Sequence, residues 1–276
     1  MERVVAPNGV VFYRSELIPC IHGFSTRIGG VSYYEHTKGL NLVYDRGDEP
    51  QIVLENLRLF SDALEIDRED IISVSQIHSS TVRYVNYENR GEGYFRDELF
   101  PCDGYLTDDP DICLGVRTAD CVPVLLYAPA NDSFDGAVAA VHAGWRGTSL
   151  GIVREAVERL YLMGADLKDI KAAIGPSIGA CCYSVRKDFY DAFMSSAGRS
   201  LTEEFVTPVG EDHWVADLKG ANRRILEMCG VVSENIDVSD MCTCCRPDEF
   251  YSHRYSKGKR GTMLSVITKA YPKKGI

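Results

Sequence analysis

The sequence predicts one α/β domain over residues 1–276, with mixed β-sheets flanked by helices. Strand-like apolar runs and amphipathic helical stretches alternate through the middle of the chain, and hairpin-like neighbouring runs occur elsewhere. The alternation predicts helices packed on sheets, and the hairpins argue against a purely parallel sheet. No internal repeat or linker divides the chain, and its length suffices to bury roughly three quarters of the unfolded surface.

The N-terminal part of the chain predicts a strand, a loop and a helix. Residues 10–13, Val-Val-Phe-Tyr, have the composition of a strand, and the polar, glycine-rich residues 22–30 predict a functional or disordered loop. Apolar residues recur at near-helical spacing over residues 49–64. We therefore expect a helix that begins near Pro50, because the fixed φ of proline suits the first helical position.

Four apolar runs in the middle of the chain predict strands at residues 71–77, 112–116, 122–127 and 136–141. The first run ends directly at His78, the second leads into Cys121, and the last ends at His142. In the third run, Pro123 has no N–H to donate, so this strand needs its proline at an edge, at a bulge or at the first position.

The rest of the chain continues the alternation. A glycine-rich turn at 143–148 leads into a helix over 149–163, which has one apolar face and is stopped by Gly164. Asp217 is a good N-cap for a helix over 218–229. Further predicted elements are a strand at 170–174, a turn at 175–179, a helix at 185–195 and a closing strand at 263–268.

Composition and charge exclude several classes of protein. With 45% hydrophobic and 25% charged residues, the chain has the composition of a globular protein and not of a disordered one. The formal charge of −10 argues against a nucleic-acid binder, because such affinity comes largely from Lys and Arg. The absence of a signal-like N-terminus and of an 18-residue apolar run predicts a cytoplasmic protein that does not span a membrane, with its ten cysteines reduced.

His78, Cys121 and His142 form a candidate metal site. A catalytic zinc takes three protein ligands and keeps one position open, and imidazole nitrogen and thiolate sulfur suit this ion. Each of the three residues follows an apolar run, and strand ends in an α/β sheet converge on one crevice. Their wide spacing matches no local zinc motif, so a surface histidine, a buried cysteine and a hydrogen-bonded structural histidine remain the alternative interpretation.

Three segments carry a resemblance to a known family: Gln-Ile-His at 76–78, Thr-Ala-Asp-Cys-Val-Pro-Val at 118–124 and Val-His-Ala-Gly-Trp-Arg-Gly-Thr at 141–148. They resemble the signature motifs of the YfiH family, the polyphenol oxidoreductase laccase proteins that include the peptidoglycan editing factor. Supporting segments lie at 24–32, 40–42, 173–178, 182–183, 217–218 and 250–254. The resemblance therefore covers the chain from about Ile21 to Val266.

The resemblance implies a single α/β domain with mixed sheets, a zinc ion held by His78, Cys121 and His142, and activity on purine nucleosides. The implied chemistry is phosphorolysis of adenosine, inosine and methylthioadenosine, together with adenosine deamination. The expected partners are thus a small nucleoside and phosphate. The family selects the same three ligands that the strand ends suggested.

The deamination reaction needs a group that passes protons to the leaving ammonia, while the metal lowers the pKa of bound water. Asp120, next to Cys121, and Asp103 in Cys102-Asp-Gly104 are the candidates. The alternative is that both aspartates cap or shape turns.

Phosphorolysis needs groups that bind phosphate in fixed geometry, and guanidinium groups do this. Arg27, Arg146 and Arg254 lie in the polar segments, and Arg146 immediately precedes a predicted helix N-terminus. The chain departs from the family pattern at Arg260-Gly-Thr262 and at Asn56-Leu-Arg58. An anion contact made by either Arg260 or Arg58 is accordingly expected to be shifted or missing.

The thiols Cys242 and Cys245 form a C-x-x-C and, with Cys181, Cys182 and Cys244, suggest a second metal site. One C-x-x-C without a regularly spaced partner pair is incomplete, so structural or incidental thiols are the favoured interpretation.

Three competing functions remain open. Copper-dependent oxidation of phenols fits the older family name. Enzymes that hold several coppers need many histidine ligands, and the chain has only six histidines. A single copper ion at His78, Cys121 and His142 is the form of this alternative that stays open. A thiol hydrolase would use Cys121 as a nucleophile on a peptidoglycan-precursor amide. A purely structural zinc would require a fourth protein ligand.

Overall fold

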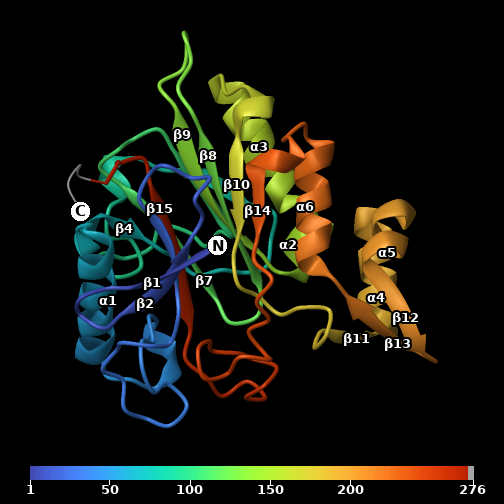
Figure 1. Ribbon diagram of the computed structural model, residues 1–276, viewed down its shortest axis with the longest axis horizontal. Helices are drawn as coiled ribbons and strands as arrows, with labels where there is room; N and C mark the ends of the chain where they lie inside the picture. The colour runs from blue at the N-terminus through green and yellow to red at the C-terminus, as the bar shows by residue number, and fades with distance from the viewer. Residues whose placement is uncertain (273–276) are drawn as a thin grey trace.

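The computed structural model describes residues 1–272. Two six-stranded sheets pack face to face between two layers of helices (Figure 1). The first sheet has the order β1 (Glu2–Val5), β2 (Val11–Arg14), β3 (His22–Ser25), β15 (Met263–Thr268), β7 (Cys113–Thr118), β4 (Ile71–Ile72). The second has the order β14 (Ile236–Val238), β10 (Lys171–Ile174), β8 (Val122–Ala128), β9 (Ala137–Ala143), β6 (Gly104–Thr107), β5 (Val82–Tyr84).

Helices cover the outer faces of both sheets. The first sheet is covered by α1 (Pro50–Leu64), and the second by α2 (Trp145–Ser149), α3 (Ile152–Met163) and α6 (Leu218–Met228) (Figure 1). A smaller layer at the far end comprises α4 (Lys187–Ala197), α5 (Arg199–Phe205) and a sheet of β11 (Ser184–Arg186), β13 (His213–Ala216) and β12 (Val206–Gly210). Among residues 1–272, no helix combines the length and apolarity needed to cross a membrane. The predicted α/β fold with mixed sheets and flanking helices is thus confirmed.

Three apolar cores separate the four layers. One lies between α1 and the first sheet, one between the two sheets, and one between the second sheet and α3 and α6. Strand alternation sorts the side chains of β9: Ala139 and Val141 face the helices, whereas Val138 and Ala140 face the first sheet. By the same period of two, His142 lies on the face toward the first sheet.

Several predicted elements agree closely with the structure. The helix expected from Pro50 is α1, and its Pro50 occupies the first turn. The closing strand is β15, with the predicted bounds. The Asp217 carboxylate accepts a hydrogen bond from Gly220 N at 3.0 Å and caps α6, as expected.

Two predictions about the N-terminal half are wrong. Residues 22–25, expected in a loop, form β3, because the closing strand β15 pairs with them and supplies their backbone partners. The run 71–77 is not a strand that ends at His78. Only Ile71 and Ile72 pair with β7. The rest is loop because its backbone N–H groups bind side chains, Ser75 N that of Glu98 and Ile77 N that of Asp103.

Two further corrections concern β8 and the helix after β9. Pro123 lies at neither an edge nor the first position. It is the second residue of a strand paired on both sides, and it is tolerated because pairing with β10 begins at Val124, one residue later. The helix expected over 149–163 starts at Trp145 and is interrupted at Gly151, whose φ of 81° is left-handed.

A buried ion pair fastens the loop after β5 to that strand. Arg83 donates to both carboxylate oxygens of Glu92 at 2.7 and 2.8 Å, and the two side chains are 6% and 2% exposed. In Glu92→Ala the guanidinium stays buried without its counter-charge, so we expect the free energy of unfolding to fall by about 3–5 kcal/mol in urea denaturation. The control Glu203→Ala removes the exposed pair with Arg199 and should cost less than about 1 kcal/mol. Equal losses in both variants would contradict this prediction.

Candidate metal centre

Strand pairing brings Cys121 and His142 together at one edge of the second sheet. β8 and β9 are antiparallel, with Val122 opposite Ala143 and Pro123 opposite His142. Cys121 directly precedes β8, and His142 is the penultimate residue of β9. Both residues therefore lie at the end of this strand pair that is remote from its connecting turn. Two residues that are 21 positions apart in the sequence thereby become neighbours.

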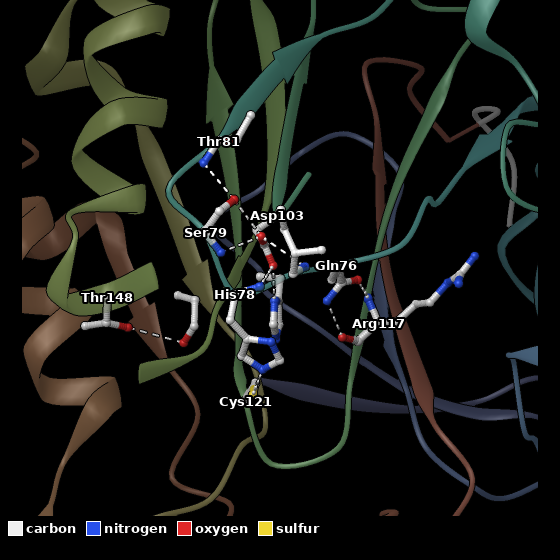
Figure 2. A network of polar contacts seen from close by, with 11 residues as sticks. Gln76, His78, Ser79, Thr81, Asp103, Arg117, Cys121 and Thr148 are labelled. Carbon is white, nitrogen blue, oxygen red and sulfur yellow. Dashed lines mark hydrogen bonds and ion pairs between the residues drawn. The ribbon is translucent and has the colours of Figure 1, made fainter. Parts of the chain in front are cut away.

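His78 reaches the same place from a loop. Its backbone has a φ of 60°, a left-handed conformation that is uncommon for a residue with a Cβ. The carboxylate of Asp103 accepts hydrogen bonds from the N–H groups of His78 at 2.9 Å and Ser79 at 2.7 Å, and from Ser79 Oγ at 2.7 Å (Figure 2). These bonds hold the loop in its strained conformation.

The three candidate ligands fit a tetrahedral ion. Their ligand atoms lie within 4.8 Å of one another, with Cys121 Sγ 3.8 Å from His78 Nε2. The rings of His78 and His142 are perpendicular, with centroids 4.9 Å apart. Zinc bound at about 2.1 Å to nitrogen and about 2.3 Å to sulfur would separate such ligands by roughly 3.4–3.8 Å. Within residues 1–272 no other His, Cys, Asp or Glu belongs to this group, an arrangement that leaves one coordination position open.

Asp103 positions His142 for metal binding. Its Oδ1 lies 2.8 Å from His142 Nδ1, so the Nδ1 proton is donated to the carboxylate and Nε2 is left toward Cys121 and His78. Asp103 is completely buried. Burial raises the pKa of this carboxyl, but the hydrogen bonds from His142 and Ser79 outweigh it and bring the pKa down to about 2. Asp103 therefore stays ionised at neutral pH.

Cys121 is a thiolate at neutral pH. Burial raises the pKa of its thiol, but the imidazoles of His142 and His78 outweigh burial and lower the pKa to about 6. Burial lowers the pKa of His142, whereas the Cys121 thiolate and Asp103 raise it to about 9. The metal-free centre is thus a thiolate–imidazolium pair. A bound metal would displace the His142 proton, because metal ligation requires the neutral imidazole.

A polar cavity of about 210 Å³ opens onto these ligands. Its walls combine the three ligands with three arginines: His78, Cys121, His142, Arg46, Arg117 and Arg260. The guanidinium of Arg117 is bound to Ser73, through Nε to Ser73 Oγ at 2.9 Å and through Nη2 to the carbonyl oxygen. Arg46 pairs with Asp45, which also lines the cavity, its Nη1 lying 3.2 Å from the carboxylate; the sequence grouped neither Arg46 nor Arg260 with the ligands.

Arg46 and Arg260 converge on one hydroxyl. Arg260 Nη1 donates to Thr262 Oγ1 at 2.6 Å, and Arg46 Nε lies 3.5 Å from the same atom. Arg260 Nε is buried and has no hydrogen-bond partner among the described residues. Burial and the neighbouring Arg46 both lower the pKa of Arg260. Among the described residues Arg260 has no carboxylate partner of its own, so an anion in the cavity would stabilise its guanidinium.

The three arginines predicted to bind phosphate do not line this cavity. Arg27 donates to the carbonyls of Lys38 and Pro247 and stacks on a tyrosine ring. Arg254 donates to the carbonyls of Cys182 and Ser184, both at 3.0 Å. Arg146 is exposed and lies over the Trp145 ring. Arg260, whose family contact was expected to be shifted or missing, is in the cavity, whereas Arg58 pairs with Glu55 and Asp62 on the surface of α1.

Asp120 is adjacent to the centre but its carboxylate is engaged elsewhere. Oδ1 accepts from Thr243 Oγ1 at 2.6 Å, and Oδ2 accepts from Arg254 N at 2.7 Å. Its φ of 93° shows that these contacts hold a strained backbone immediately before ligand Cys121. In this geometry Asp120 anchors the connection between β14 and β15 beside the candidate ligand Cys121.

The chain is similar to known proteins along nearly its whole length. Residues 21–270 match the family described as multi-copper polyphenol oxidoreductase laccase. Purine nucleoside phosphorylase YlmD of Bacillus subtilis is 35% identical over 253 residues, which cover 90% of this chain and 87% of that protein. Adenosine deaminase RL5, from an unknown prokaryotic organism, is 34% identical over 236 residues, covering 85% of this chain and 88% of that protein.

The fold has a close counterpart among solved structures. The crystal structure of the hypothetical protein YfiH from Bacillus licheniformis superposes with a TM-score of 0.88 at 32% identity, and the match covers 96% of this chain and 98% of that one.

The role of Asp103 predicts a loss of metal affinity in Asp103→Asn. The amide carries no charge to hold the Nδ1 proton of His142 and accepts fewer bonds from the His78 loop. We expect zinc affinity to fall by about 10- to 100-fold in a competition titration against a chromophoric chelator. Asp132→Asn, an exposed aspartate in the β8–β9 turn, should bind zinc like the unaltered chain. Full affinity in Asp103→Asn would refute the positioning role.

Gly144 lies against all three ligands, so a side chain there should disturb them. A Cβ on Gly144 would lie 2.9 Å from His78 Cδ2, 3.3 Å from Cys121 Sγ and 3.4 Å from His142 Cε1. Overpacking costs about 1–3 kcal/mol, so Gly144→Ala should weaken zinc binding roughly tenfold or more in the same titration. Gly210→Ala, where the new Cβ meets its nearest neighbour at 3.9 Å, is the matched control. Unchanged zinc affinity in Gly144→Ala would show that the ligands have room to move.

Proposed function

Since the chain belongs to the multi-copper polyphenol oxidoreductase laccase family, the YfiH family that its motifs predicted, we propose that it is a zinc-dependent purine nucleoside phosphorylase. The proposed substrates are adenosine, inosine and methylthioadenosine, and phosphate is the second substrate. The observation that carries this proposal is one cavity lined by both a three-ligand metal site and two converging guanidinium groups. Relatives that carry the name purine nucleoside phosphorylase support it.

The donor set suits zinc. Two imidazole nitrogens and one thiolate make a borderline-soft tetrahedral site with an open position, and the thiolate form of Cys121 is available at neutral pH. When bound, zinc supplies a Lewis acid beside the anion site. Asp103 fixes the His142 tautomer that this ligation needs, so we assign it as a positioning residue.

Arg46 and Arg260 would hold the attacking phosphate. In phosphorolysis a phosphate oxygen forms a bond to the ribose C1′ while the bond from C1′ to the purine nitrogen breaks, and the purine leaves with the electron pair and gains a proton. The products are the free base and ribose 1-phosphate, or 5-methylthioribose 1-phosphate from methylthioadenosine. The guanidinium groups of Arg46 and Arg260, which line the cavity next to the metal ligands, bind the phosphate dianion and orient it.

Adenosine deamination is the second candidate function, and the open coordination position together with the relative named adenosine deaminase RL5 favours it. That reaction replaces the purine amine with oxygen from water and needs no phosphate. Asp120 is the candidate proton carrier from the sequence. It would first have to release Thr243 and the Arg254 N–H, so phosphorolysis fits the geometry better.

Phosphate dependence and metal dependence test the proposal together. Zinc-loaded protein should release free base from inosine only when phosphate is present, as detected by mass spectrometry. The variant His78→Ala should lose both its zinc and the release of free base. In Arg260→Ala the KM for phosphate should rise roughly 10- to 100-fold, since a hydrogen bond to a charged group contributes about 1.5–3 kcal/mol. Its zinc content should not change.

The control for Arg260→Ala is Arg58→Ala, which removes an exposed arginine of α1 and should leave the KM for phosphate unaltered. Base release that persists after complete removal of metal would instead indicate that the Cys121 thiolate acts as a nucleophile. Conversion of adenosine to inosine without phosphate would favour the deaminase. If the zinc-loaded protein neither releases free base nor deaminates adenosine, both the phosphorylase and the deaminase proposals are wrong.

A further inference from the structure

Five cysteines lie on two loops at the far edge of the second sheet. β10 and β14 are parallel neighbours, with Ile174 opposite Val238, so the loops that follow them leave the sheet side by side. A parallel bridge between Ser177 and Cys242 continues the pairing beyond the strands. The first loop therefore presents the vicinal pair Cys181 and Cys182 to the C-x-x-C of the second loop.

Four of these thiols converge. The sulfur atoms of Cys181, Cys182, Cys242 and Cys245 all lie within 4.8 Å of one another. Cys245 Sγ is 3.3 Å from Cys182 Sγ and 3.6 Å from Cys181 Sγ. Four sulfurs at about 2.3 Å from one zinc form a tetrahedron with edges of about 3.8 Å, whereas a disulfide needs about 2.05 Å. The spacing matches one tetrahedral ion.

The surroundings suit a cluster of thiolates. Gly179 N donates to Cys242 Sγ at 3.2 Å, the kind of backbone hydrogen bond that stabilises a metal-bound sulfur. The buried Lys219 donates to the carbonyls of Ser239 at 2.7 Å and Met241 at 2.9 Å, which places its ammonium beside the segment that carries Cys242. A zinc with four thiolates carries a net charge of −2, and a buried cation nearby offsets part of it.

We propose that Cys181, Cys182, Cys242 and Cys245 bind one zinc ion in a closed structural site. All four positions are taken by protein sulfur, so this ion has no place for a substrate, unlike an ion at His78, Cys121 and His142. The site is independent of the proposed phosphorylase activity. The sequence favoured incidental thiols because it showed one C-x-x-C; the fold supplies the missing pair from a loop about 60 residues earlier.

A zinc ion at this site would tie together the two loops that contact Asp120, the residue before Cys121. From the first loop, Ile178 N donates to the Asp120 carbonyl at 2.9 Å; from the second, Thr243 Oγ1 donates to its carboxylate at 2.6 Å. Arg254 joins the loops, donating through its guanidinium to the Cys182 carbonyl. The second ion thus holds in place the loops that support Asp120, the residue before ligand Cys121.

The metal content of variants that lack one of the two zinc sites tests the proposal. The full chain, purified with zinc under reducing conditions, should contain two zinc ions per chain by inductively coupled plasma mass spectrometry. The double variant Cys182→Ser/Cys245→Ser should contain one, and so should His78→Ala, which loses the other ion. Cys244→Ser, which alters a neighbouring thiol outside the group of four, should retain two. Two ions in the double variant, or one ion in the unaltered chain that disappears in His78→Ala, would overturn the second site.

Thiol labelling of the unaltered chain guards against a variant that fails to fold. Cys181 and Cys245 are exposed, so free thiols there would react readily with a maleimide. Zinc should protect both residues, and a chelator should release them to rapid labelling, as located by peptide mass spectrometry. Equally fast labelling with and without the chelator would refute metal binding. So would a disulfide among the four residues in the reduced, zinc-loaded protein.

Discussion

The hydrogen bonds of the buried Asp103 carboxylate are the interactions on which the geometry of the candidate metal centre depends. The carboxylate accepts the Nδ1 proton of His142 from β9 and the backbone N–H groups of the His78 loop, so one side chain orders two of the three ligands. Burying a carboxylate is costly, and here five donors offset the cost: three backbone N–H groups, the Ser79 hydroxyl and an imidazole. These hydrogen bonds stabilise the left-handed backbone conformation of His78.

The charges of the cavity are arranged in two groups. Cys121 and Asp103 supply negative charge on the side of the imidazoles, where a cation would bind. Arg46 and Arg260 supply positive charge in the same cavity, where Asp45 pairs with Arg46 and where burial and the neighbouring Arg46 lower the pKa of Arg260. A cation beside the first group and an anion beside the second would balance the charges of both groups.

The candidate triad and the proposed four-thiol site differ in the way their ligands are supplied. His78, Cys121 and His142 come from the junction between the two large sheets, near the inter-sheet core, and leave one position open. The four thiols come from loops at the end of the second sheet and leave none. Asp120 links the two, since its carbonyl and carboxylate bind both cysteine loops while its neighbour Cys121 is a ligand.

The sequence by itself determined the α/β class, the helix from Pro50 and the closing strand, and it named the three candidate ligands that the fold gathers within 4.8 Å, because hydrophobic periodicity, caps and motif residues are local signals. Pairings between distant segments are not local, so only the tertiary structure decided that β15 makes a strand of residues 22–25 and that Asp103 stands behind His142. It also decided which arginines reach the cavity: Arg27 and Arg254 are taken by backbone carbonyls, whereas Arg46 and Arg260 meet at Thr262. The role of an arginine depends on which hydrogen-bond partners the fold places around its guanidinium group. The spacing of residues in the sequence does not predict those partners.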